Sequence, residues 1–200
     1  MTDRLKGKVA IVTGGGSRGP GIGNGKAAAT LFAREGARVL CVDLEVKRAQ
    51  ETVDVILSEG GIASAWAGDV TRREDCRRMV SAAIERYGAL DILHNNVGIE
   101  SRKDLLETSE EEWDRVMAVD LKSMLLATQA AAVPMVQRGA GAVICVSSVA
   151  ALRGHGRPWS RAWGRRCASA GAARRPSVPR APGGTWAGPR SISPATRRAG

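Results

Sequence analysis

Short apolar runs alternate with longer amphipathic segments along the first three quarters of the chain. The runs are four to six residues long and rich in β-branched residues, which is typical of strands buried on both faces. Between them, apolar residues recur at helical spacing. The pattern therefore predicts an α/β fold with a doubly wound, Rossmann-like parallel sheet covered by helices on both faces. The predicted strands are 9–12, 37–42, 62–67, 90–94 and 142–146, and the predicted helices are 24–36, 45–58, 71–87 and a last one from 110 toward Pro134.

Capping residues mark two of the predicted helix starts. Thr71 is followed by Glu74 three residues on, the pattern of a capping box, so we predict that Thr71 is the N-cap of the third helix. Ser109 is predicted to cap the fourth helix. Trp113 and Met117 lie four residues apart on that helix, and we expect both to be core residues.

A glycine-rich turn follows the first predicted strand. Residues 14–23 contain six glycines, between the apolar run 9–12 and an alanine-rich helical segment. Glycines let the backbone approach a pyrophosphate closely, and a helix N-terminus offers free N–H groups and a positive dipole end. Ordinary loops also collect glycine, but the strand and the helix on either side favour a phosphate-binding turn of a dinucleotide site.

Asp43 closes the second predicted strand and is placed to accept hydrogen bonds from a ribose 2′-OH. A carboxylate there favours NAD over NADP because it repels a 2′-phosphate. The alternative is a solvated aspartate at a helix start. Arg18, inside the glycine-rich turn, could instead favour NADP, but a charge at the ribose edge acts more directly, so we predict NAD.

Two asparagines follow the fourth predicted strand, where ligands bind in parallel sheets. Asn95 and Asn96 either fix a turn, as asparagines often do, or line the cofactor site, and their position favours the second interpretation. His94, just before them, is interpreted as a structural residue at the strand end because no partner is evident.

Charge and composition divide the chain into two parts. Residues 1–152 hold 19 basic and 20 acidic side chains, whereas residues 153–200 hold 11 arginines and no acid. The second part has too few branched aliphatic residues to bury a core. We therefore expect a domain over 1–154 and a disordered segment rich in Arg, Pro, Gly and Ala over 155–200. A reading-frame slip in a GC-rich coding sequence would explain such a segment; nucleic-acid binding by its arginines is the less favoured alternative.

The remaining composition points to an unexported chain. The four cysteines (41, 76, 145 and 167) are scattered and no histidine lies near them, which favours reduced thiols over disulfides or a metal site. No continuous apolar run has transmembrane length and no charged-then-apolar leader is present. We expect a cytoplasmic protein without a membrane partner.

In order and spacing, four motifs resemble those of the short-chain dehydrogenase/reductase family, over about residues 5–154. Thr13-Gly14 with Gly21-Ile22-Gly23 resembles the family's glycine-rich turn. Asp69-Val70 resembles its acidic site after the third strand, and Asn95-Asn96-Val97-Gly98 its N-N-A-G segment. Ser147-Ser148, after the fifth strand, resembles the family's serine site.

The resemblance implies an NAD-dependent oxidoreductase that acts on a secondary alcohol or ketone and forms homo-oligomers. It implies that Ser148 orients the substrate oxygen and that Asp120, at a position where the family usually has asparagine, belongs to the catalytic site. The implied cofactor-binding residues are Gly14, Ser17, Gly21, Ile22, Gly23, Asp43, Asp69, Val70, Asn95, Val97 and Gly98.

The sequence departs from the family pattern in three places. Six residues separate Gly14 from Gly21, where the family has three, and Asp120 replaces asparagine. The family's tyrosine and lysine fall at Arg161 and Arg165, and no tyrosine follows Tyr87. We therefore expect impaired turnover, with a non-catalytic dinucleotide-binding protein as the alternative. We also expect a sheet that is incomplete beyond its fifth strand, which disfavours oligomer formation.

Overall fold

In the computed structural model, which describes residues 3–19, 21–101, 103 and 106–148, five parallel strands form one sheet. The described residues belong to one unit that spans Met1–Gly156. Two predictions, the disordered segment 155–200 and the absence of strands beyond the fifth, fall on residues outside the described part. The strand order is β3-β2-β1-β4-β5. The strands are β1 (Val9–Thr13), β2 (Arg38–Asp43), β3 (Ile62–Ala67), β4 (Ile92–Asn95) and β5 (Ala142–Cys145).

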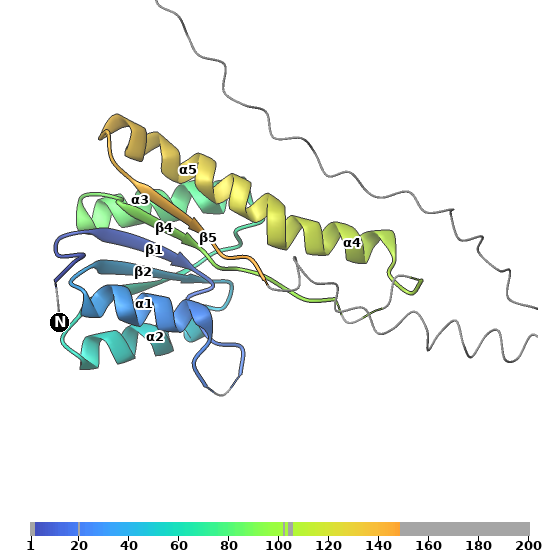
Figure 1. The fold of residues 1–200 in the computed structure, drawn as a ribbon, viewed down its shortest axis with the longest axis horizontal. Helices are drawn as coiled ribbons and strands as arrows, with labels where there is room; N and C mark the ends of the chain where they lie inside the picture. The colour runs from blue at the N-terminus through green and yellow to red at the C-terminus, as the bar shows by residue number, and fades with distance from the viewer. Residues whose placement is uncertain (1–2, 20, 102, 104–105, 149–200) are drawn as a thin grey trace, which may run out of the picture. The chain divides into compact units, whose positions relative to one another are not determined.

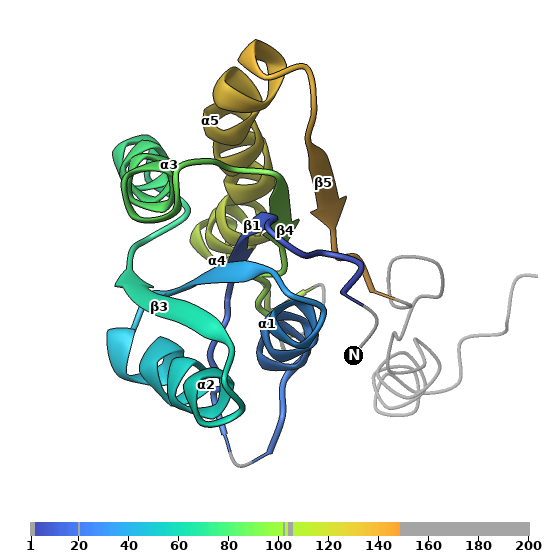
Figure 2. The same cartoon turned by 90° about the vertical axis from the view of Figure 1, so that its left-hand side faces the viewer.

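Helices cover the two faces of this sheet. Figure 2 shows α1 and α2 on one face and α3 and α5 on the other. Ala29 of α1 and Ala49 and Val53 of α2 pack against one face of the sheet, whereas Met79 of α3 and Ala127 of α5 pack against the other. The predicted doubly wound α/β fold is thus confirmed. The helices are α1 (Asn24–Arg34), α2 (Val46–Ser58), α3 (Arg73–Tyr87), α4 (Glu110–Met117) and α5 (Ser123–Gln137), with a π-helical turn, η1 (Ala118–Lys122), between the last two.

One of the two predicted helix caps is confirmed and the other is wrong. Ser109 precedes α4, and its hydroxyl accepts a hydrogen bond from the N–H of Glu112 at 3.3 Å. Thr71, however, lies two residues before α3. Its N–H and its hydroxyl both donate to one carboxylate oxygen of Asp69, at 2.9 and 2.7 Å. Asp69 therefore binds the residue that would otherwise cap the helix.

The two outer strands are less buried than their apolar sequences predict. β1 is buried along its whole length, whereas β3 is half-buried and all four residues of β5 are exposed. Both outer strands have a strand neighbour on one side only within the described residues. The prediction that every strand is covered on both faces is therefore wrong for β3 and β5.

Helix α4 continues from α5 beyond the carboxyl ends of the strands (Figure 1). None of its residues is buried, and Trp113 is 58% exposed. The expectation that Trp113 is a core residue is therefore wrong, because no part of the sheet lies beneath this end of the helix. Met117, at the end of α4, is half-buried.

The helical segment Glu110–Gln137 is long and apolar enough to cross a membrane by length and composition, with a mean hydropathy of 1.4. The core helix of a soluble protein meets the same criterion, and here Leu126, Ala131 and Met135 of α5 are buried under the sheet. Pro134 lies inside α5 and does not end it.

A buried carboxylate fixes the amino ends of three strands. Asp91 is 6% exposed, and its side chain accepts a hydrogen bond from the N–H of Val9 at 2.9 Å. Lys8 and Arg138 lie 3.7 and 3.4 Å from its other oxygen. The carbonyl of Asp91 also accepts from the N–H of Ala142, at 2.8 Å. This cluster aligns the starts of β1, β4 and β5, at the sheet edge opposite the strand carboxyl ends.

Candidate functional site

Three of the predicted site segments lie at one edge of the sheet. Because all strands are parallel, their carboxyl ends lie together, and Thr13 of β1 pairs with Val42 of β2. β1 also pairs with β4, and the connections from these two strands lead to helices on opposite faces. Ligands of open α/β sheets bind at such a switch point. The glycine-rich turn, Asp43 and the segment after Asn95 all follow strands at this edge, and the space beyond the carboxyl ends of β1 and β4 is called the crevice below.

The first half of the glycine-rich turn is bound tightly to β2 and α2. The N–H of Gly15 donates to the carbonyl of Val42 at 2.9 Å, and the hydroxyl of Thr52 donates to the carbonyl of Gly15 at 2.7 Å. The N–H of Gly16 donates to the Asp43 carboxylate at 3.2 Å. These bonds hold the turn down where it leaves β1.

Two glycines that sequence reasoning did not select have no room for a side chain. A Cβ on Gly16 would lie 2.4 Å from Cβ of Arg48, and one on Gly25 would lie 1.9 Å from the carbonyl oxygen of Gly14. The close contact of α1 with the turn therefore requires glycine at 25. The third glycine of a phosphate-binding fingerprint serves helix–strand packing, and this rule could have indicated Gly25.

The second half of the turn is a projecting loop with a closed base. The N–H of Gly23 donates to the hydroxyl of Ser17 at 3.1 Å. Beyond this bond, Gly21 has a φ of 111° and open space around it, and Ile22 is 75% exposed. Ser17, predicted to contact the cofactor, thus binds the loop's own backbone here.

The N-terminus of α1 keeps free donors. The N–H of Ala27 makes the first helical bond, to the carbonyl of Gly23 at 2.9 Å. Within the described part of the chain, the N–H groups of Asn24, Gly25 and Lys26 have no acceptor. Free amides at the positive end of a helix dipole can bind an anion, so this terminus is a candidate anion site next to the turn.

Asp43 is half-exposed at the end of β2 and uses both carboxylate oxygens locally. One accepts from Gly16, and the other accepts from the N–H of Glu45 at 3.2 Å. Each carboxylate oxygen has a second lone-pair direction, so both can accept a further hydrogen bond from solvent or ligand. The side chain is therefore fixed in direction and still able to bind a hydroxyl.

The two asparagines after β4 have different surroundings. The side-chain amide of Asn96 donates to the carbonyls of Thr13 and Gly14 at 3.4 and 3.1 Å. The backbone N–H of Asn96 donates to the Thr13 hydroxyl at 3.1 Å. Asn96 thus fixes the turn after β1. Asn95 is 3% exposed and donates to the hydroxyl of Thr128 on α5, at 3.2 Å. The turn-fixing interpretation therefore fits Asn96.

The end of β3 is organised by two aspartates. Asp69 accepts the bonds from Thr71 described above, and its own N–H donates to the Asp75 carboxylate at 3.0 Å. This bond, together with the Arg78 guanidinium at 2.6 Å, lowers the pKa of the Asp75 carboxyl. Val70 is buried. Asp69 and Val70 therefore form a rigid border of the crevice on the β3 side.

Asp120 reaches the end of β4 from the π-helical turn. Its carboxylate accepts from the N–H of Ile99 at 2.8 Å, and a Cβ placed on Gly98 would lie 3.8 Å from the same oxygen. π-helical turns are frequent at functional sites because they redirect a side chain. Asp120 and the segment 97–99 thus lie together.

The serine site follows β5. The N–H of Val146 donates to the carbonyl of Asn95 at 2.9 Å, so the chain toward Ser148 stays beside β4 to this point. Ser148 is exposed and is the last described residue. Arg161 and Arg165, at the expected tyrosine and lysine positions, lie outside the described residues.

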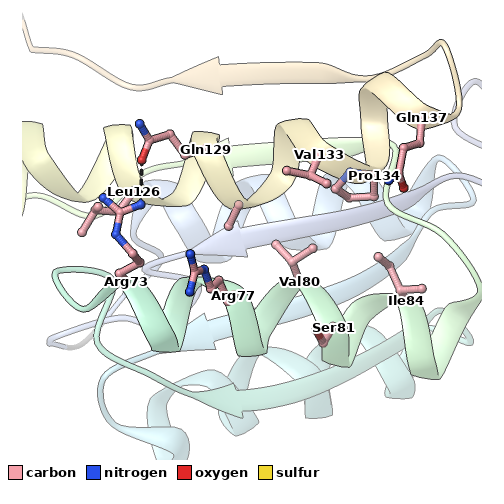
Figure 3. A pocket seen from close by; sticks show the side chains of 11 residues that line it. Arg73, Arg77, Val80, Ser81, Ile84, Leu126, Gln129, Val133, Pro134 and Gln137 are labelled. Carbon is pink, nitrogen blue, oxygen red and sulfur yellow. Dashed lines mark hydrogen bonds between the residues drawn. The ribbon is translucent and has the colours of Figure 1, made fainter.

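A groove of about 500 Å³ lies elsewhere, between α3 and α5 (Figure 3). Figure 3 shows Val80 and Ile84 of α3 facing Val133 and Pro134 of α5, with Arg73 bound to Gln129. None of the predicted site residues lines this groove. It follows the helices and not the carboxyl ends of the strands, so it is separate from the crevice.

Comparisons with known proteins agree with this arrangement. Residues 8–159 match a sequence model of the short chain dehydrogenase family. An uncharacterized oxidoreductase of Thermotoga maritima is 42% identical over 150 residues, which cover 75% of this chain and 57% of that protein. A 3-oxoacyl-[acyl-carrier-protein] reductase of the same organism is 35% identical and is covered to 60% of its length. The crystal structure of a Burkholderia xenovorans protein described as a short-chain dehydrogenase/reductase shares 37% identity and a TM-score of 0.74, over 76% of this chain and 61% of that one.

Proposed function

Because this chain belongs to the short-chain dehydrogenase/reductase family, we propose that it binds a nicotinamide dinucleotide, NAD in preference to NADP, in the crevice between β1 and β4. Members of the family bind NAD or NADP and are generally soluble. The chain spans 57% and 60% of the length of the two Thermotoga maritima relatives. The activity of a complete relative is therefore only proposed for this chain.

The crevice contains groups suited to each part of the dinucleotide. The free N–H groups of residues 24–26 suit the pyrophosphate. The closely packed turn, with no room for a side chain at Gly16 or Gly25, lets the backbone approach it. The single observation that carries the proposal is the Asp43 carboxylate, fixed beside that turn by the Gly16 N–H.

The preference for NAD follows from the charge of Asp43. A ribose 2′-OH can donate to the carboxylate, whereas a 2′-phosphate would bring like charges together at that point. Arg18 favours the alternative, NADP, because it lies in the same turn and is exposed. We give Asp43 more weight than Arg18 because hydrogen bonds from the backbone N–H groups of Gly16 and Glu45 fix the direction of its carboxylate.

The proposed reaction is the oxidation of a secondary alcohol or the reduction of a ketone. A bound nicotinamide ring supplies the hydride chemistry, and Ser148 would orient the substrate oxygen by hydrogen bonding. The sequence has arginine where the family has its tyrosine and lysine. A positioned general acid–base group contributes roughly 10²–10⁴-fold to a rate, so we propose a turnover reduced by at least that factor.

A second candidate is a dinucleotide-binding protein without catalysis. The arginines at positions 161 and 165 favour it, because a guanidinium is not a base near neutral pH. A cytoplasmic location and homo-oligomer formation remain predictions from the resemblance. Nucleic-acid binding would involve the arginines of 155–200, outside the described residues, and is the least favoured.

Titration of the purified chain with NAD⁺ and NADP⁺ by calorimetry tests the proposal. We expect NAD⁺ to bind at least about tenfold more tightly, and Asp43→Ala to remove the difference. Glu45→Gln, a change of an exposed carboxylate two residues on, is the matched control and should keep the preference. Failure of both dinucleotides to bind would refute the proposal. A parallel assay of alcohol oxidation separates the enzyme from the non-catalytic binder.

A further inference from the structure

We propose that the carboxylate of Asp120, held against the segment after β4, makes the crevice selective for the oxidised form of the nicotinamide cofactor. This inference rests on the proposed function and adds to it a preference between the two redox states. The family resemblance implies an uncharged asparagine at this position, whereas this sequence has an aspartate.

The position of Asp120 is fixed from two sides. The π-helical turn Ala118–Lys122 widens the helix at this residue, and the Ile99 N–H binds one carboxylate oxygen at 2.8 Å. The other oxygen has no hydrogen-bond partner among the described residues. Arg115 is the cation that interacts with Asp120, but its guanidinium already makes two bonds of 2.9 Å to Glu112. Within the described residues, Asp120 thus has no salt bridge, and Arg115 divides its charge between Asp120 and Glu112.

The half of the cofactor that lies nearest follows from the arrangement of the strands. The pyrophosphate belongs at the N-terminus of α1, and the acidic residue after β2 belongs to the adenosine ribose. The β3-β2 side of the sheet is therefore the adenosine side. β4 and β5 lie on the other side of β1, so the other nucleotide would extend over them. Ile99 and Gly98 follow β4, so Asp120 faces the nicotinamide half.

The redox states differ in charge at that half. The oxidised nicotinamide ring carries a positive charge, and the reduced ring is neutral. A carboxylate near the ring therefore attracts only the oxidised form. Asparagine at 120 would keep an oxygen for the Ile99 N–H and remove this attraction. At separations of several ångströms in a partly solvated crevice, one such charge changes an affinity roughly threefold to tenfold.

Binding of NAD⁺ and of NADH is measured by calorimetry for the full chain and for Asp120→Asn. We expect the ratio of the dissociation constants, NADH over NAD⁺, to fall roughly threefold to tenfold in the variant, mainly through weaker NAD⁺ binding. Asp114→Asn, an exposed carboxylate on α4, is the control and should leave the ratio unchanged. Thermal melting checks folding, and Asp120→Ser serves as the second neutral variant if Asp120→Asn does not fold.

The outcomes separate this inference from the proposed function. An unchanged ratio, with both forms still bound, overturns the selectivity and leaves the cofactor site intact. An equal loss of both affinities also overturns it, because Asp120 would then act only on the shape of the crevice. If the unchanged chain binds neither form, the proposed function itself fails.

Discussion

The backbone N–H of Gly16 donates to the carboxylate of Asp43 at 3.2 Å. This bond joins the glycine-rich turn after β1 to the residue proposed to select the adenosine ribose. The phosphate-binding and ribose-binding parts of the crevice are thus one hydrogen-bonded unit, and a change in one is expected to disturb the other.

A methyl group at Gly16 should therefore damage both parts. Its Cβ would lie 2.9 Å from the backbone carbonyl carbon of Arg48 and 2.9 Å from the Asp43 carboxylate. We expect Gly16→Ala to destabilise the fold by about 1–3 kcal/mol and to weaken NAD⁺ binding, measured by denaturation and by titration. Gly19→Ala is the control, since no atom lies within 4 Å of a Cβ there. Equal stability of the two variants would contradict the expectation.

Removal of the Asp91 carboxylate should cost stability without changing cofactor affinity. Asp91→Ala leaves the buried N–H of Val9 without its acceptor and removes the partner of Lys8 and Arg138. We expect a loss of about 2–4 kcal/mol in the free energy of unfolding, measured with urea. Asp91→Asn keeps one acceptor and should lose less. A clear loss of NAD⁺ affinity in a folded variant would show that the two sheet edges are coupled.

His94 should make stability depend on pH in the acid range. His94 is 8% exposed and packs edge-on against Phe32, with 5.7 Å between the ring centroids. Burial lowers the pKa of its imidazole. The unfolded chain takes up a proton near pH 6.5, whereas the folded chain does so only at lower pH. The unfolding free energy should therefore fall as the pH drops below 6.5, by up to about 1.4 kcal/mol per unit.

The variant His94→Leu tests this dependence. It removes the titrating group and should flatten the slope between pH 6.5 and 5, in chemical denaturation followed by circular dichroism. His155→Gln changes the other histidine of the chain and should keep the slope. If the His155 variant flattens it instead, the assignment to His94 is wrong.

The cysteines should differ strongly in reactivity. Burial raises the pKa of the Cys41 thiol to about 12 and that of Cys76 to about 11, whereas Cys145 is exposed. In a Cys167→Ser background, a thiol reagent at pH 8 should modify one cysteine of the native chain and three after denaturation, because the thiolate is the reactive form. Peptide mapping should identify Cys145 first; rapid labelling of Cys41 would indicate local opening of β2.

Much of the fold could be predicted because its elements have local signals. The run 62–67 coincides with β3, and Gly88 ends α3 with a φ of 86°, a conformation that glycine adopts easily. The order of apolar runs and helices was sufficient for a parallel sheet. These features depend on neighbours in the sequence, which is why periodicity indicates them.

The exposure of the outer elements could not be predicted in the same way. β5 and the central strand β1 have similar apolar sequences, but β5 lies at the edge of the described sheet. Trp113 has helical apolar spacing and yet is 58% exposed, on helix α4, which extends beyond the sheet. Burial depends on which elements are neighbours in space, and residue spacing carries little information about this.

The positions of the candidate site segments followed from the sequence more readily than their hydrogen bonds did. The turn, Asp43, Asp69 and the segment after Asn95 all lie at one edge, as their positions after strands indicate. Several of these side chains, however, bind the protein's own backbone, as Ser17 does with Gly23. Spacing reveals where a polar group stands but not which of several nearby partners it selects.

Because the base of the glycine-rich loop is closed, a change in the length of the loop is not expected to disturb the rest of the domain. The Ser17–Gly23 bond joins the two ends of the loop, and Gly19 and Gly21 have open space around them. Extra residues between these ends add only a slowly growing entropy of loop closure. The loop is therefore a natural place for length to vary between homologous chains, and it offers protein engineers a site where a short peptide or reporter could be inserted beside the crevice while β1 and α1 keep their positions.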